Sequence, residues 1–299
     1  MNSILLLVGV SSGFAHSIYS AISKSLLKNR ITEPFLLFLY INIFQAIITP
    51  VMWLFVKPTL PPLAGWTPLL IAGVTCVIAY LFLYMSLSCG DASSVMPIMG
   101  SKVIFAGFLA IPMLNESHGW PVYCAAILVA ISIATLSYSP SKIRSNKFPL
   151  KPILLMIVCS IVFAFTDIYI KRSLVFLGPY NFMIYYNLII GVGSLSVVPY
   201  IKKKKVSLVL KGRSLWLSLI SSIFIIASTL LFVITLKIAH GVVVPNILIS
   251  SRGVFIVIIS AVLAHRGSTI LETQNKKVYL LRCAASSLII FSIWIALNN

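Results

Sequence analysis

Two cations lie deep inside apolar segments of this sequence, where charged side chains are rare. Lys102 is the only charged residue within residues 92–115, and Arg252 is the only formally charged residue within residues 238–264. A charge at the centre of a membrane helix costs about 2.5–3.5 kcal/mol on insertion scales, so such residues usually face a cavity or a partner. The two cations therefore indicate a path for a ligand or an ion.

The same short pattern surrounds both cations: Ser-Lys-x-x-Phe starts at Ser101 and Ser-Arg-x-x-Phe starts at Ser251. Arginine offers a planar fork for a carboxylate or phosphate, and lysine offers a compact point charge. Two nearby cations repel each other in a low-dielectric site, so they need a counter-charge or a water-filled cavity. The pair, with both serines beside it, predicts a substrate-binding site for an anion or a zwitterion. The alternative is that one cation pairs with Asp167 and that both are structural.

Asp167 is the only acidic residue in the interior of an apolar segment. It can neutralise a buried cation, bind an amine of the substrate, or carry a coupling proton. The alternative is an ion pair with Lys171, four residues later on the same helix face. The sequence leaves these roles open.

Aromatic and histidine side chains give further candidates for substrate binding. His16 and Tyr19 share one helix face, and Tyr80 and Tyr84 form an i,i+4 pair. Histidine can relay protons or donate to a ligand, and tyrosines suit a ligand with an apolar or cationic part. The alternatives are a hydrogen bond between helices for His16 and helix packing or an interfacial belt for the tyrosines.

The composition is that of an integral membrane protein. Of the 299 residues, 60% are hydrophobic and 9% are charged, and the mean hydropathy is +1.05. Lipid leaves no partner for unpaired backbone groups, and about 20 apolar residues span the hydrocarbon core as a helix. We therefore expect an all-α membrane fold of ten transmembrane helices, at residues 3–27, 34–56, 67–88, 92–114, 119–138, 152–174, 180–200, 214–237, 241–264 and 278–297.

The charge is strongly unbalanced, with 23 Lys and Arg against five acids and a net charge of +18. Most basic residues lie in short loops, where they set topology and contact anionic headgroups, so no nucleic-acid partner is expected. If the ten spans alternate in direction, 17 basic residues lie on one side, and the other side has Lys57, Lys171, Arg172 and Lys237. The positive-inside rule then places both termini outside, in the periplasm or its equivalent. We expect the membrane to be a bacterial inner membrane.

The two halves of the chain, residues 1–148 and 149–299, are related in sequence. Matching residues keep an offset of 145–150 positions: Phe14 and Phe163, Pro34 and Pro179, Tyr40 and Tyr185, Asn42 and Asn187, Ala79 and Ala227, Leu83 and Leu231, Val95 and Val243, Pro97 and Pro245, and Lys102 and Arg252. Five spans per half is an odd number, so the second half enters the membrane upside down. Such inverted repeats are typical of transporters, with the site near the midplane between them.

Pro97 and Pro245 occupy matching positions in the fourth and ninth expected spans. Proline removes a helical hydrogen bond and introduces a bend, which suits alternating access. We therefore assign a gating role to both, although proline also occurs in membrane helices without such a role.

No motif indicates catalysis, a metal or a cofactor. HExxH, GxSxG and P-loop patterns are absent, the histidines are scattered, and five acids are too few for a carboxylate metal site. The five cysteines lie in or beside apolar segments, where we expect packing residues and no disulfide framework. The N-terminus lacks a basic n-region, so residues from Ser3 are expected to form a membrane helix and not a removed signal peptide.

The segment from Tyr84 to Pro97, followed by apolar residues up to Leu114-Asn115-Glu116, is similar to the third-to-fourth helix signature of EamA-type members of the drug/metabolite transporter superfamily. The second copy is degenerate, with Ala264-His265-Arg266 in place of the Glu motif. The resemblance implies ten helices in two inverted repeats and a central cavity lined by helices one, three, four, six, eight and nine. It also implies that this cavity is lined by Lys102, Arg252, Asp167, His16 and Tyr80. Termini outside would depart from many relatives.

We therefore expect a secondary transporter or exchanger of a small anionic or zwitterionic metabolite, with an amino acid or derivative favoured. Lys102 and Arg252 would hold the anionic group, and Asp167 would face an amine or act in coupling. Protons or a counter-substrate are candidate coupling partners, and a homodimer is left open. The alternatives are proton-coupled efflux of organic cations or drugs, a nucleotide or nucleotide-sugar exchanger, and a lipid-handling membrane enzyme or structural subunit.

Overall fold

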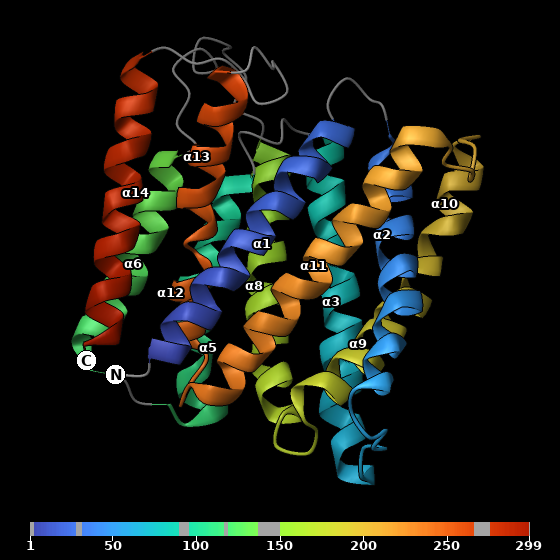
Figure 1. Cartoon of the computed structure of the whole chain (residues 1–299), viewed down its shortest axis with the longest axis horizontal. Helices are drawn as coiled ribbons and strands as arrows, with labels where there is room; N and C mark the ends of the chain where they lie inside the picture. The colour runs from blue at the N-terminus through green and yellow to red at the C-terminus, as the bar shows by residue number, and fades with distance from the viewer. Residues whose placement is uncertain are drawn as a thin grey trace.

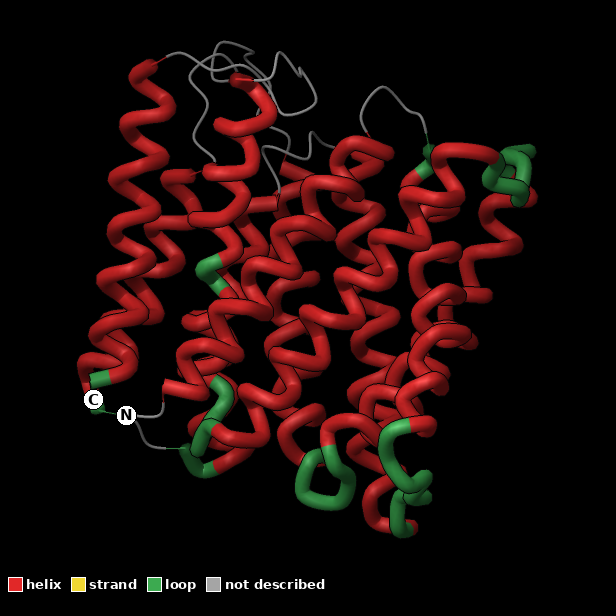
Figure 2. Tube along the Cα trace, in the orientation of Figure 1, coloured by secondary structure: helices red, strands yellow, loops and turns green. Residues whose placement is uncertain are grey.

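The computed structural model describes residues 3–27, 32–89, 96–116, 119–136, 150–265 and 276–298, and all regular secondary structure in these residues is helical. Figure 2 shows the described residues as helices with short loops between some of them. The expected all-α class is therefore confirmed. In chain order the elements are α1 (Ser3–Leu27), α2 (Pro34–Ile48), η2 (Thr49–Leu54), α3 (Leu63–Cys89), η3 (Met96–Ser101), α5 (Lys102–Leu114), α6 (Trp120–Leu136), α8 (Leu150–Ser173), α9 (Pro179–Ser194), η4 (Leu195–Val197), α10 (Val198–Lys203), α11 (Gly212–Ile238), α12 (Val243–Ile249), α13 (Arg252–His265) and α14 (Lys276–Leu297).

Long apolar helices make up most of the bundle. Within the described residues, six segments are long and apolar enough to cross a membrane: Ser3–Leu27, Pro34–Leu54, Leu63–Cys89, Leu150–Ser173, Pro179–Lys203 and Gly212–Ile238. The other four expected spans contain shorter apolar helices, at Ile98–Leu114, Trp120–Ile133, Val243–Ile259 and Ala284–Leu297. Large apolar side chains such as Leu7, Phe108, Trp120 and Phe291 are exposed. A helical surface of this kind suits contact with lipid.

Two helix pairs form the centre of the bundle. α3 packs along α8, and α1 packs along α11. α2 packs against α9 on one flank, and α6 packs against α14 on the other (Figure 1). The buried core extends through all six of the long segments, and a second apolar cluster joins α6, α12 and α14. The central pairs position the side chains described below.

The ninth expected span is interrupted between α12 and α13. The N–H of Ser250 donates to the carbonyl of Ile247 and the N–H of Ser251 to that of Leu248, both at 3.1 Å and both three residues back. The hydroxyl of Ser250 donates to the carbonyl of Asn246 at 2.8 Å. A continuous helix would pair that carbonyl with the backbone N–H of Ser250, and serine hydroxyls that compete in this way bend or end helices.

The bend therefore lies away from the proline that was expected to cause it. Pro245 lies in the first turn of α12, where its missing N–H leaves no helical bond unmade. Pro97 lies in η3, and its side chain is outside the described residues. The change from the 3-10 helix η3 to α5 makes Lys102 the first residue of α5, and the interruption after α12 makes Arg252 the first residue of α13. The gating role of the prolines stays a prediction.

Helix α1 crosses this interruption at Gly13. A Cβ atom added to Gly13 would overlap the hydroxyl of Ser251 and lie 2.9 Å from the backbone nitrogen of Arg252. Glycine therefore allows α1 to approach the start of α13 more closely than any other residue would, as small residues do between membrane helices.

We expect Gly13→Ala to destabilise the protein because the added methyl group must displace backbone at the interruption. Overpacking of this kind costs about 1–3 kcal/mol, and the melting temperature of the detergent-purified protein should fall by several degrees. Gly178→Ala is the matched control, since a Cβ atom there meets nothing within 4 Å. Equal melting temperatures for the two variants would show that the close approach has no energetic importance.

Candidate functional site

A cavity of about 310 Å³ lies between the two central helix pairs. It extends from Ile170, near the end of α8, to Leu27 and Leu87, near the ends of α1 and α3. Seven of the predicted substrate-binding residues line it: His16, Tyr19, Tyr80, Tyr84, Lys102, Asp167 and Arg252. The fold thus brings together residues from α1, α3, α5, α8 and α13.

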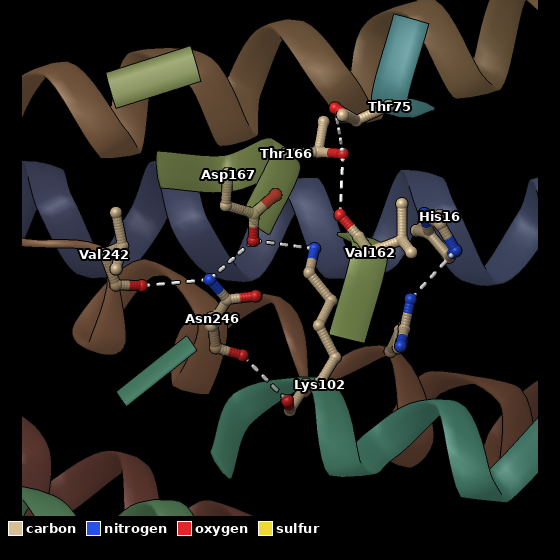
Figure 3. Close-up of polar contacts among 10 residues, drawn as sticks. His16, Thr75, Lys102, Val162, Thr166, Asp167, Val242 and Asn246 are labelled. Atoms are coloured by element: carbon tan, nitrogen blue, oxygen red, sulfur yellow. Dashed lines mark hydrogen bonds and ion pairs between the residues drawn. The ribbon is translucent and has the colours of Figure 1, made fainter. Parts of the chain in front are cut away.

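Asp167 and Lys102 form an ion pair at one side of the cavity. The ammonium of Lys102 lies 2.8 Å from Oδ2 of Asp167, and the side chains are only 14% and 4% exposed. Asn246 donates to the same oxygen at 2.8 Å (Figure 3). The ammonium also lies 5.7 Å and 5.1 Å from the ring centres of Phe163 and Phe232, a range in which a cation is attracted to an aromatic face. Asp167 therefore supplies the counter-charge of Lys102.

Arg252 has a neutral partner. Its Nη1 lies 3.1 Å from Nε2 of His16, and Nδ1 of His16 lies 3.4 Å from the hydroxyl of Ser228. A guanidinium can only donate, so Nε2 must accept and the ring proton must be on Nδ1. The hydroxyl of Ser228 donates in turn to the carbonyl of Ser12 at 3.0 Å. This series of hydrogen bonds holds His16 as a neutral imidazole and orients one edge of the Arg252 guanidinium.

The centre of the cavity consequently carries an unmatched positive charge. Lys102, Arg252 and Asp167 line the cavity there, so two cations face one carboxylate, while the third lining cation, Lys24, lies in the last turn of α1. In the part of the chain that the structure describes, no carboxylate lies within ion-pair distance of Arg252. The electrostatic field in a cavity of this kind attracts an anion.

Three predicted residues do not line the cavity. The hydroxyl of Ser101 donates to the carbonyl of Ile98 at 2.6 Å, and Ser251 is buried with its hydroxyl against Gly13. Pro245 is buried within the core. The predicted alternative pairing of Asp167 with Lys171 is also not the arrangement in the structure, since Lys171 binds backbone carbonyls instead.

Several cavity residues were not identified from the sequence. Asn246 contacts Asp167, while Phe163 and Phe232 flank the ammonium of Lys102, and Ser228 supports His16. Asn246 had a usable signal, because an amide in the interior of an apolar span is uncommon and needs partners. The two phenylalanines had none, since an aromatic residue in an apolar helix usually packs against other helices.

The family model for EamA-like transporters matches residues 3–138. This match, over the first half of the chain, relates it to the drug/metabolite transporter superfamily. No curated protein sequence matches the chain. A solved structure described only as a crystal structure of a protein is similar over 99% of this chain and 97% of that chain, with a TM-score of 0.73 and 13% sequence identity. At this identity the likeness shows the fold alone. The family match indicates a membrane transporter.

At the opposite end of the cavity, where α8 and α11 end (Figure 1), lysines cross between the two helices. Lys171 of α8 donates to the carbonyls of Leu236, at 2.6 Å, and of Ala239, at the end of α11. Lys237 of α11 donates to the carbonyl of Leu174, just after α8, at 2.5 Å. The last carbonyls of a helix lack partners in the helix and attract cations. Each helix end is thus capped by a cation from the other.

Two further contacts link these helix ends to α5 and α12. Arg172 donates through Nη2 to the carbonyl of Met113 at 2.6 Å. Both oxygens of Glu116 lie 3.0–3.1 Å from the backbone nitrogen of Val242. Lys171, Lys237 and Arg172 are three of the four basic residues that the expected ten-span topology would place on one side. We call Lys171, Arg172, Lys237 and Glu116 the latch.

The Lys102–Asp167 pair offers a direct test of the site's electrostatics. Lys102→Met or Asp167→Asn alone leaves one buried charge without its partner, which costs about 3–5 kcal/mol. The double variant removes both charges, so it should recover most of the thermal stability lost in either single variant. The measurement is thermal unfolding of the purified protein.

The exposed ion pair between Lys204 and Glu33, at 3.1 Å, is the matched control. Breaking it with Lys204→Met should change stability by at most about 1 kcal/mol. Additive losses in the Lys102/Asp167 double variant would show that the two side chains are not coupled.

Proposed function

We propose that this chain is a secondary transporter or exchanger of a small metabolite that carries an anionic group. The observation that carries the proposal is Arg252, which lines the central cavity and has only a neutral histidine as its side-chain partner among the described residues. Lys102, the other predicted anion ligand, is matched by Asp167. The anionic group of the substrate is therefore expected at Arg252, with Lys102 behind it.

The helix pairing supports a ten-span arrangement in two inverted repeats. In such an arrangement α1 is equivalent to α8, and α3 is equivalent to α11. If each helix is replaced by its equivalent in the other half, the α3–α8 pair becomes the α11–α1 pair. These are the two central pairs of the bundle. The flanking pairs, α2 with α9 and α6 with α14, each join equivalent helices. The cavity would lie on the pseudo-two-fold axis, where transporters of this design bind substrate.

The membrane orientation follows from the same arrangement. The start of α1 and the end of α14 lie on the same side of the bundle (Figure 1). The end of α1 and the starts of α8 and α14, which adjoin segments rich in basic residues in the sequence, lie on the opposite side. We propose a bacterial inner membrane with both termini outside, so the cavity extends toward the cytoplasmic side.

Efflux of organic cations fits the cavity less well. Asp167, the acid that would bind such a cation, is already bonded to Lys102 and Asn246. A nucleotide would bring two or more negative charges to a centre where only one cation is unmatched.

We expect Arg252→Ala to abolish transport, because it removes the unmatched charge, and the partner that it leaves behind, His16, is neutral. Solute counterflow in proteoliposomes, with a panel of radiolabelled carboxylates and amino acids, should show at least a tenfold loss, on the order expected for a charge-assisted contact. Lys57→Ala removes an exposed cation outside the cavity and should leave uptake unchanged. Undiminished uptake by the Arg252 variant would exclude the proposed site.

The latch gives alternating access a physical basis. Rocking of one repeat against the other opens one end of a central cavity while it closes the other. The cavity extends toward the ends of α1 and α3. At the ends of α8 and α11, a lysine from each helix binds carbonyl groups at the end of the other. Opening the second end requires these helix ends to separate, and the charge-assisted bonds of the latch must then break.

Replacing both Lys171 and Lys237 with Met should shift the protein toward the state that is open on the side of Lys57. A cysteine introduced at Ile170, which lines the cavity near the latch, reports this opening in a background without native cysteines. Labelling by a membrane-impermeant maleimide from the Lys57 side should increase severalfold. Lys57→Met is the control, and unchanged labelling in the double variant would mean that the latch does not hold this end closed.

A further inference from the structure

The charges that line the cavity restrict the substrate more closely than the proposed function does. Its centre holds one matched ion pair and one further cation, Arg252. We infer that the ligand is an amphipathic organic acid with a single negative charge and no ammonium group. This inference rests on the proposed function and excludes the zwitterionic amino acids that the sequence favoured.

A substrate ammonium would find no carboxylate in this cavity. Among the described residues that line it, Asp167 is the only acid, and its Oδ2 accepts from both Lys102 and Asn246. The Asp167 side chain is only 4% exposed. An ammonium placed beside a carboxylate at Arg252 would also lie near two cations, and like charges repel strongly in a low-dielectric site. Breaking the Lys102–Asp167 pair to bind the ammonium would leave Lys102 unmatched.

Arg252 is prepared for one planar anionic group. His16 accepts a hydrogen bond from one N–H of the guanidinium at 3.1 Å, and this contact orients the plane of the guanidinium. Five N–H donors are present in a guanidinium, and two parallel donors can bind the two oxygens of a carboxylate. Because His16 is an acceptor in this contact, it adds no positive charge that would favour a second anionic group.

The rest of the cavity suits an apolar body. Most of the lining is aromatic or aliphatic, including Tyr84, Leu83 and Leu87, and Ser23 and Lys24 line the end toward the last turns of α1. The volume of about 310 Å³ is at the small end of the range for ligand sites. A carboxylate at Arg252 would thus place a short hydrocarbon or single aromatic ring along this wall, toward the ends of α1 and α3.

Four compounds that share a phenylethyl group test this charge selectivity. They are the anion 3-phenylpropionate, the zwitterion L-phenylalanine, the neutral amide 3-phenylpropionamide and the cation 2-phenylethylammonium. An aliphatic set with the same design is hexanoate, L-norleucine, hexanamide and pentylammonium. Binding to the full-length protein in nanodiscs is measured by titration calorimetry or thermal shift. The acid should bind at least about tenfold more tightly than the other three members of at least one set, as expected for one charge-assisted contact.

Arg252→Gln should reduce the affinity for the acid to that for the amide, while the affinity for the amide should stay the same. Lys57→Gln, which removes an exposed charge outside the cavity, should preserve the preference for the acid. Retention of the preference by the Arg252 variant would overturn the inference.

The remaining outcomes separate this inference from the proposed function. Equal or tighter binding of the zwitterion would overturn the inference and leave a transporter of anionic or zwitterionic metabolites in place. Tightest binding of the amide or the cation, or no binding by any compound, would overturn both.

Discussion

The buried ion pair between Lys102 and Asp167 is the interaction on which the rest of the site depends. Neither charge would be tolerable alone in an apolar bundle, and each is held by further contacts, an amide donor for the carboxylate and two aromatic rings for the ammonium. Because the pair is internally balanced, it removes one cation and one acid from the charges available to a ligand. What remains at the centre is Arg252, so the pair decides the sign of the cavity.

The interrupted helices make this arrangement possible. Lys102 and Arg252 begin α5 and α13, and each side chain therefore projects from the start of a helix near the middle of the bundle. A continuous helix through Ser250 and Ser251 would change the direction of the Arg252 side chain. Gly13 allows α1 to lie directly against the interruption, which also places His16, one turn later, beside the guanidinium. The orientation of Arg252 thus depends on how closely α1 packs against the start of α13.

Lysines have two different roles at different depths of the bundle. At the centre, a lysine is neutralised by a carboxylate, whereas at the end of the cavity lysines bind backbone carbonyls. Carbonyls at a helix end carry only a partial charge, so these bonds can be exchanged for water when the helices separate. A full ion pair would be costlier to break without a replacement partner. The difference suits a stable centre and an end that opens and closes.

The sequence by itself determined the fold class, the positions of the apolar helices and the identity of the central charges. These follow from composition and from the cost of placing any charge in lipid, so Lys102, Asp167 and Arg252 stand out without structural information. The helix interruption at Ser250, the pairing of Asp167 with Lys102 and not Lys171, and the roles of Asn246, Phe163 and the latch were decided only by the tertiary structure. Helical periodicity gives the face on which a side chain lies but not which of the neighbouring helices meets that face. The partner of a charge, and hence the sign of the cavity, depends on contacts between residues that are far apart in the chain.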